Sequence, residues 1–139
     1  MSRSLRYQLR IDVPERIAER LRAGAEDPEL AELGVILGRH DAEAICQFDA
    51  FAGYCAEAER QGIDRYPLYR WTRATIDDPV KKAKYLKSFT LYVKGEEVYP
   101  GVAADALERE LRPLVGGGVV DRLQRYDTDP ANNPQPPAG

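Results

Sequence analysis

Apolar and polar residues alternate along the first segment of the chain. The apolar positions of this alternation are Leu5, Tyr7, Leu9, Ile11 and Val13. Because successive side chains of a strand point to opposite faces, the pattern predicts a strand with one buried and one polar face. Val13, Ile17 and Leu21 then recur every fourth residue and predict a short amphipathic helix that Gly24 ends.

The middle of the chain is predicted to be helical. Asp27 and Pro28 open a helix of leucines that Gly38 closes, and the longest helix is predicted over residues 41–61. The apolar stripe of this long helix consists of Ile45, Phe48, Phe51, Ala52 and Cys55. Its other sides also carry apolar residues, so it is expected at the centre of the protein, with Phe48 in the core.

Short helices and a hairpin are predicted for the second half. Residues 64–75 and 79–88 favour helical turns, and residues 103–114 favour a longer helix. Between them, residues 89–93 alternate in polarity, and residues 96–99 return the chain as a β-hairpin after a turn at Lys94-Gly95.

The predicted fold is therefore α+β and predominantly helical. One N-terminal strand and the late β-hairpin form a small sheet, and the helices pack around the central helix at about 41–61. A chain of 139 residues, 43% of them apolar, can bury one ordinary core, so residues 1–126 are expected to form a single globular domain. Residues 119–126 add a helical turn or two at its end. Residues 127–139 carry four prolines and no apolar pattern, and are expected to be a disordered tail.

The formal net charge of −3 conceals a segregation of charge along the chain. Residues 12–59 carry twelve acids against four arginines, whereas residues 60–94 carry nine Lys and Arg against three Asp. Such segregation favours docking to an oppositely charged partner, or it is satisfied internally by ion pairs between helices. Both interpretations remain open from the sequence.

Few residues suit catalysis or metal binding. His40 is the only histidine, and it is expected in solvent near a helix start rather than as a ligand or base. Cys46 and Cys55 lie too far apart on the predicted helix to form a bridge, which favours buried free thiols and a reducing, cytoplasmic compartment. We therefore expect no catalytic residue, no metal and no cofactor. The chain also lacks an apolar run of membrane-spanning length, so no membrane association is expected.

The segment 65–87 mixes cations with flat rings. Its candidate partner-binding residues are Arg65, Tyr66, Tyr69, Arg70, Trp71, Arg73, Lys81 and Lys84, and Lys82 and Lys87 add to its positive charge. Trp, Tyr and Arg are enriched at interface hot spots, and the same mixture can hold phosphates by charge and bases by stacking. In the alternative interpretation, the rings belong to the core and the cations only face solvent.

The N-terminal strand and helix, residues 7–21, resemble the opening of ribbon-helix-helix DNA-binding proteins, and residues 38–45 resemble the start of that family's second helix. In that family a strand pairs across a dimer and its polar face enters the major groove. The resemblance implies Arg6, Gln8 and Arg10 as DNA-contacting residues. The sequence departs from the family between the two helices, where about fifteen additional residues intervene.

Residues 89–101 and the helix after them are similar to the final hairpin and helix of thioredoxin-like domains. Ser88 replaces the proline that precedes that hairpin in the family, and the chain has no Cys-x-x-Cys motif. The resemblance thus implies a fold without the family's redox activity.

These observations predict a non-catalytic accessory or regulatory protein that docks on a protein partner with an acidic surface through residues 65–87. The alternative is a dimeric ribbon-helix-helix-like DNA-binding regulator. A homodimer remains an open possibility, and nucleic acid is the less favoured partner.

Overall fold

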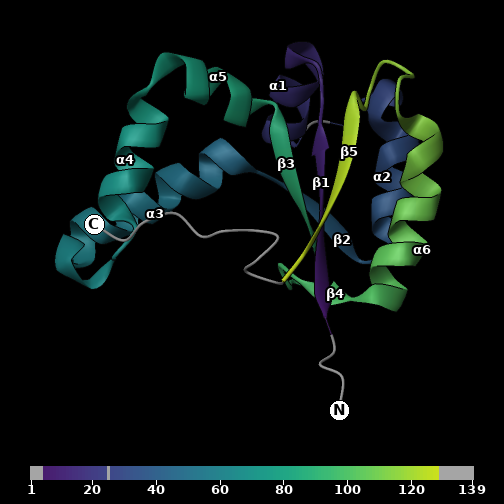
Figure 1. Cartoon of the computed structure of the whole chain (residues 1–139). Helices are drawn as coiled ribbons and strands as arrows, with labels where there is room; N and C mark the ends of the chain where they lie inside the picture. The colour runs from purple at the N-terminus through teal and green to yellow at the C-terminus, as the bar shows by residue number, and fades with distance from the viewer. Residues whose placement is uncertain (1–4, 25, 129–139) are drawn as a thin grey trace.

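The computed structural model describes residues 5–24 and 26–128, which form a five-stranded antiparallel sheet with six α-helices and three short 3₁₀ helices (Figure 1). The strands are β1 (Arg6–Asp12), β2 (Ala42–Cys46), β3 (Ser88–Val93), β4 (Tyr99–Pro100) and β5 (Arg122–Asp127). The α-helices are α1 (Glu15–Ala23), α2 (Ala31–Arg39), α3 (Gln47–Gln61), α4 (Tyr69–Asp77), α5 (Pro79–Leu86) and α6 (Gly101–Leu111). The 3₁₀ helices are η1 (Pro28–Leu30), η2 (Ile63–Arg65) and η3 (Arg112–Leu114). The predicted class, α+β and predominantly helical, is confirmed.

The predicted N-terminal strand is present as β1, and it lies in the middle of the sheet. Residues 9–12 of β1 pair with β3, and the same residues also pair with β5, so these two partners occupy opposite edges of β1. β2 pairs with β3 and extends the sheet on that side. The alternation of β1 is explained by this position, because a central strand must present one complete face to the core.

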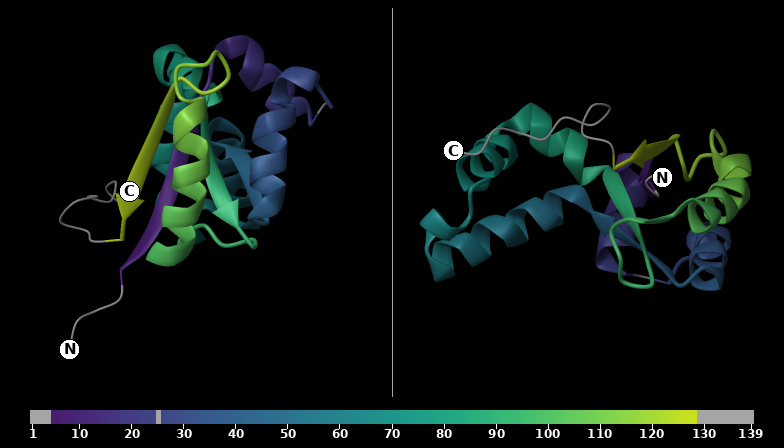
Figure 2. Two further views of the ribbon diagram at one scale, coloured as in Figure 1. Left: turned by 90° about the vertical axis from the view of Figure 1, so that its right-hand side faces the viewer. Right: turned by 60° about the horizontal axis from the view of Figure 1, so that its bottom comes forward.

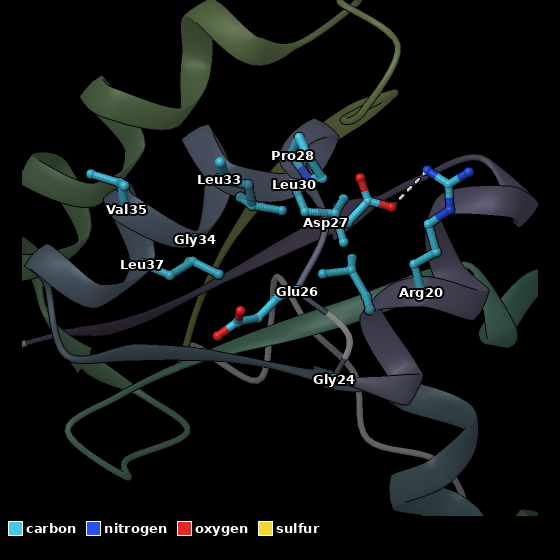
Figure 3. Close-up of a pocket in the computed structure, with 12 residues that line it drawn as sticks. Arg20, Gly24, Glu26, Asp27, Pro28, Leu30, Leu33, Gly34, Val35 and Leu37 are labelled. Atoms are coloured by element: carbon cyan, nitrogen blue, oxygen red, sulfur yellow. Dashed lines mark ion pairs between the residues drawn. The ribbon is translucent and has the colours of Figure 1, made fainter.

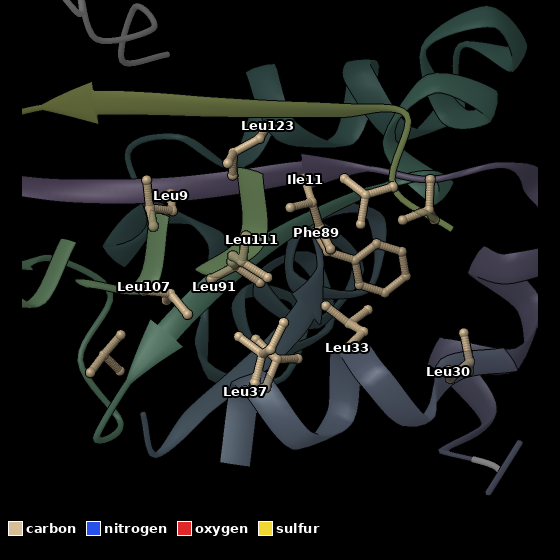
Figure 4. Close-up of a cluster of buried hydrophobic side chains, with 14 of the residues drawn as sticks. Leu9, Ile11, Leu30, Leu33, Leu37, Phe89, Leu91, Leu107, Leu111 and Leu123 are labelled. Carbon is tan, nitrogen blue, oxygen red and sulfur yellow. The ribbon is translucent and has the colours of Figure 1, made fainter. Parts of the chain in front are cut away.

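The core lies on one face of the sheet. Leu9 and Ile11 of β1 pack there with Phe89 and Leu91 of β3, and Leu9, Ile11 and Leu91 have no solvent-exposed surface (Figure 4). Helices α1, α2 and α6 cover this face with buried side chains, which include Ile17, Leu33, Leu37, Leu107 and Leu111. The two views of Figure 2 show α2 and α6 together on this side.

The opposite face of the sheet is polar and leads to a second group of helices. Gln8 and Arg10 of β1 lie on this face with Thr90 and Tyr92 of β3, each between two core-facing neighbours. Helices α3, α4 and α5 extend away from this side, and we call residues 47–86 the helical lobe (Figures 1 and 2). The sheet therefore stands between two groups of helices.

The prediction of one central helix over residues 41–61 is wrong. Residues 42–46 form β2, and the helix α3 begins only at Gln47. Ala44 and Cys46 lie opposite Leu91 and Phe89 of β3, so pairing with β3 overrides the helical tendency of this segment. The helix α3 is peripheral, because its only buried residues are Gln47, Cys55 and Ala58, and Phe48 is only half-buried at the edge of the core.

The predicted late hairpin is also replaced by a different pairing. The chain turns after Lys94, and Val93 and Glu96 form an isolated bridge. Tyr99 and Pro100 then pair with Tyr7 and Arg6 of β1 rather than with β3. The physical reason is Tyr99, whose buried hydroxyl accepts a hydrogen bond from the Leu9 amide of β1 (2.8 Å) and donates one to the Leu91 carbonyl (2.9 Å).

The C-terminal part of the described chain is a strand, not the predicted helical turns. Leu123 of β5 pairs with Ile11 and is buried in the core. Burial of this side chain explains why the segment pairs with β1 as a strand. Asp127 pairs with Tyr7, so the predicted domain boundary at residue 126 falls inside β5. Within the predicted disordered tail, residues 129–139 lie outside the described residues.

Ion pairs of Arg125 join β5 to α6. These contacts predict that the packing of β5 on α6 weakens at acidic pH. Its guanidinium lies 2.6 Å from the Asp105 carboxylate and 2.9 Å from that of Glu108. The hydrogen bond from Arg125, and next that from Arg112, hold the pKa of Glu108 below its usual value. Ionised Glu108 therefore stabilises the fold at pH values above the unfolded pKa, and this contribution is lost as the pH falls through the lowered folded pKa.

We expect Glu108→Gln to lower the melting temperature at pH 7, and the difference from the wild type to shrink steadily below about pH 4. Thermal unfolding of both proteins between pH 3 and 7 measures this difference. A constant difference over that range would mean that the ionisation of Glu108 does not contribute to attaching β5.

Candidate functional site

A groove separates the helical lobe from the polar face of the sheet. Its volume is about 540 Å³, within the range of small-ligand sites. The sheet side is lined by Arg10, Ile45, Thr90, Tyr92 and the nearby Glu97. The lobe side is lined by Gln47, Ala50, Phe51, Tyr54, Leu68, Trp71, Thr72 and Tyr85. The groove thus joins segments that are far apart in the sequence, from Arg10 to Glu97.

Aromatic rings form the lobe wall of the groove. The Phe51 ring of α3 meets Trp71 of α4 edge-to-face, with centroids 6.0 Å apart, and meets Tyr85 of α5 in the same way at 5.1 Å. Tyr54 accepts a hydrogen bond from the Leu68 amide at 3.1 Å. These contacts hold the three helices of the lobe together and leave half-buried rings at the groove.

The floor of the groove is polar and internally ordered. The Arg10 side chain donates a hydrogen bond to Gln8 Oε1 at 2.6 Å, and its guanidinium lies 4.5 Å from the centre of the Tyr126 ring. The Gln8 amide donates to Glu97 at 3.3 Å. Burial, and then the nearby Glu97 carboxylate, raise the pKa of Tyr92, so its hydroxyl remains a hydrogen-bond donor over the neutral range.

The predicted partner-binding residues lie in three environments: the groove, contacts within the helical lobe, and the exposed surface. Trp71 lines the groove, and Tyr66 packs edge-to-face on Tyr54 with centroids 5.4 Å apart. Tyr69 donates a hydrogen bond to Glu59 at 2.7 Å, and Arg73 pairs with Asp77 at 2.8 Å. The remaining four, which are exposed, are Arg65, Arg70, Lys81 and Lys84.

Lys and Arg side chains form fewer ion pairs inside the helical lobe than outside it. Outside it, ion pairs join Arg6 to Glu96, Arg16 to Glu29, Arg20 to Asp27, Arg39 to Glu110, Arg112 to Glu108 and Arg125 to Asp105. In the lobe and just after it, the exposed cations with no ion pair to any described residue are Arg60, Arg65, Arg70, Lys81, Lys82, Lys84 and Lys87. Lys82 and Lys84 instead lie over the rings of Phe48 and Tyr85, each at 5.3 Å from the ring centre. Among the described Lys and Arg residues of the basic segment 60–94, only Arg73 forms ion pairs with carboxylates.

The residues implied by the ribbon-helix-helix resemblance make contacts within the chain. Arg6 pairs with Glu96 at 3.1 Å, Gln8 is buried, and Arg10 is part of the groove floor. Both edges of β1 are paired within the chain, so β1 has no free edge for the intermolecular ribbon of that family. The likeness of residues 7–21 is therefore local and does not extend to the arrangement that reads DNA.

His40 and the cysteines are held in structural positions. His40 was expected in solvent, but its Nε2 contacts the Glu110 carboxylate, which Arg39 also contacts, so this cluster joins the end of α2 to α6. Cys46 and Cys55 are free and buried, as predicted, and burial raises the pKa of both thiols. Over the described ranges, no group of three or more His, Cys, Asp or Glu residues could hold a metal ion.

A second hollow lies between α1 and α2 (Figure 3). Its volume is about 770 Å³, and its lining is mainly aliphatic, with Leu21, Leu33 and Leu37 beside Gly34. The ion pair between Arg20 and Asp27, 3.0 Å long, stands at one end. Its lining has no aromatic rings, and its Arg20 and Asp27 side chains are already paired with each other, so the groove is the stronger candidate site.

Of the residues that line the groove, the sequence analysis singled out Trp71 as a partner-binding residue and Arg10 as an implied DNA-contacting residue. Phe51 and Tyr54 were placed in a central helix, and Tyr85 and Tyr92 were not singled out. The alternation along β1 identifies its polar face. This polar face, together with the aromatic residues of the segment 65–87, is the sequence feature that points to the groove.

The comparisons with known proteins leave the site to be interpreted from its own chemistry. No family model, no curated protein and no solved structure matches the chain. In residues 5–24 and 26–128, the longest helix has 15 residues, and none combines the length and apolar character needed to cross a membrane.

Proposed function

We propose that this protein is a non-catalytic accessory protein that docks an acidic surface of a protein partner through the cations of the helical lobe. The observation that carries the proposal is the contrast in charge satisfaction. The exposed lobe cations lack ion pairs to described residues, whereas most arginines on the sheet side hold carboxylates.

The arrangement of the lobe supports a protein partner. Arg70 and Lys81 lie on successive helices and are exposed, so an acidic surface can meet them without unfolding any element. Oppositely charged surfaces speed association and fix the register of a complex. The aromatic contacts of Phe51, Trp71 and Tyr85 hold the helices that present these cations in a fixed relation.

The engagement of the chemically reactive side chains supports a non-catalytic role. His40 is held against Glu110, and both thiols are buried with raised pKa values, which disfavours the reactive thiolate. Two free cysteines also suit a cytoplasmic setting, and we include this location in the proposal.

The test reverses two lobe cations. Arg70→Glu combined with Lys81→Glu is expected to abolish capture of partner proteins from extracts of the native host. Arg73 is left unchanged, since its pairs with Glu59 and Asp77 would make its reversal a test of stability. Lys81 follows the Asp78 cap of α5, where an acid suits the helix dipole, so the fold is expected to survive.

The matched control is Arg109→Glu combined with Arg122→Glu, which reverses two exposed arginines outside the lobe. Proteins captured by the wild type and the control, but not by the lobe variant, are purified and their affinity is measured at two salt concentrations. The lobe variant is expected to bind about tenfold or more weakly than the wild type at the lower salt concentration. This difference in affinity is expected to shrink at the higher concentration, because salt screens the attraction between exposed charges. Equal capture by both variants, or capture that nuclease treatment of the extract abolishes, would contradict docking of a protein through the lobe.

A further inference from the structure

The groove has an occupant available within the same chain. We propose that the proline-rich segment 129–139 binds in the groove between the helical lobe and the polar face of the sheet, as an intramolecular ligand. This inference does not depend on docking through the lobe cations, because Arg70 and Lys81 do not line the groove.

The first support is where the described chain ends. Tyr126 of β5 lies against Arg10, a groove residue, with the guanidinium 4.5 Å from the ring centre. Thr128 is close to β1, since its Oγ1 accepts a hydrogen bond from the Arg6 amide at 3.3 Å. Eleven residues follow, and an extended proline-rich chain of this length spans about 34 Å, ample to return over the polar face of the sheet.

The second support is the match of chemistry. Segments that contain several prolines dock in grooves lined by aromatic rings, because their prolines pack flat on the rings and little conformational entropy is lost. The segment 129–139 contains Pro130, Pro134, Pro136 and Pro137. The rings that line the groove are Phe51, Tyr54, Trp71, Tyr85 and Tyr92.

The third support is a set of unused hydrogen-bond donors. The described residues provide no acceptor for the Trp71 indole N–H or for the hydroxyls of Tyr85 and Tyr92. Four of the eleven residues of this segment are prolines without an N–H, whereas every residue offers a carbonyl. Donors on the groove and acceptors on the segment are therefore complementary. The hollow between α1 and α2 has a mainly aliphatic lining without aromatic rings.

The test uses Trp71, the only tryptophan of the chain, as a reporter inside the groove. Truncation after Thr128 is expected to shift its fluorescence emission to longer wavelength and to increase quenching by acrylamide. Adding a synthetic peptide of residues 129–139 to the truncated protein should reverse both changes in a saturable titration. Far-UV circular dichroism is expected to be unchanged, because the truncation leaves β5 complete.

Full-length variants keep the test independent of truncation. Pro134→Ala, Pro136→Ala and Pro137→Ala combined should reproduce the fluorescence of the truncated protein, whereas Asn132→Ser with Asn133→Ser should match the wild type. Tyr92→Phe in the truncated protein should weaken peptide binding by about three- to tenfold if its hydroxyl donates to the segment.

Two results would overturn the proposal. One is identical emission and quenching in the full-length, truncated and proline-substituted proteins, with no saturable response to the peptide. The other is a difference that disappears when the full-length protein is diluted, since occupancy by a second copy depends on concentration and occupancy within one chain does not.

Discussion

Phe89→Ala is expected to lower the free energy of unfolding by about 3–5 kcal/mol, the range for truncating a fully buried phenylalanine. Phe89 is 1% exposed and lies on β3 between Ile11 of β1 and Cys46 of β2. Buried side chains of α1 and α2 belong to the same core cluster as Phe89, so the cavity left by the ring is not readily refilled. Denaturation in urea, with the slope of the transition compared between proteins, measures the loss.

Phe48→Ala is the matched control for Phe89→Ala. Phe48 of α3 only borders the core, and its ring is half-buried with Lys82 over it at 5.3 Å. We expect a loss below about 2 kcal/mol, since much of the ring stays in contact with solvent in the folded state. If Phe48→Ala were the more damaging of the two substitutions, the core would centre on α3 rather than on the sheet.

Tyr99→Phe is expected to destabilise the protein by about 1–3 kcal/mol, although it removes a single oxygen atom. The Tyr99 side chain is 2% exposed, and its hydroxyl accepts from the Leu9 amide and donates to the Leu91 carbonyl. Removing the hydroxyl leaves the Leu9 N–H and the Leu91 C=O buried without this partner, and water does not reach them. The expected loss therefore exceeds that of an ordinary hydrogen bond at the surface.

Tyr92→Phe serves as the control for Tyr99→Phe. Both substitutions are compared in the chain truncated after Thr128, which lacks the proposed occupant of the groove. There the Tyr92 hydroxyl lies on the polar face of the sheet and makes no hydrogen bond to a described residue, so we expect a change within about 0.5 kcal/mol. Thermal and urea unfolding of both variants measures the contrast. Equal losses would mean that the hydroxyl of Tyr99 does not join β4 to the rest of the sheet.

The helical lobe and the groove beside it have different chemical characters. The exposed lobe cations present charge without ion pairs to described residues, which suits an acidic protein surface. The groove presents aromatic rings with hydrogen-bond donors, which suits an extended proline-rich segment. The two proposals therefore concern separate surfaces, and the charge-reversal and proline substitutions test them separately.

Local sequence patterns predicted the correct structure where residues close in the sequence determine it. The alternation of Leu9 and Ile11 identified β1, and the Asp78-Pro79 pair identified the start of α5, where the Asp78 side chain accepts from the Val80 amide at 2.9 Å. The same patterns failed for residues 42–46, because alanine and cysteine at alternate positions also fit a helix. Only Leu91 and Phe89, far away in the sequence, determine that these residues pair as a strand.

The candidate site divides in the same way. The sequence by itself determined the α+β class, the buried free cysteines and the concentration of cations in residues 60–94, since composition and short-range periodicity carry these properties. Only the tertiary structure decided which cations keep ion pairs, as for Arg73, and which rings line a groove, as for Trp71 and Tyr92. Ion pairing and shared surfaces depend on distances between segments remote in the chain, and these distances exist only after the sheet has brought β1, β3 and the helical lobe together.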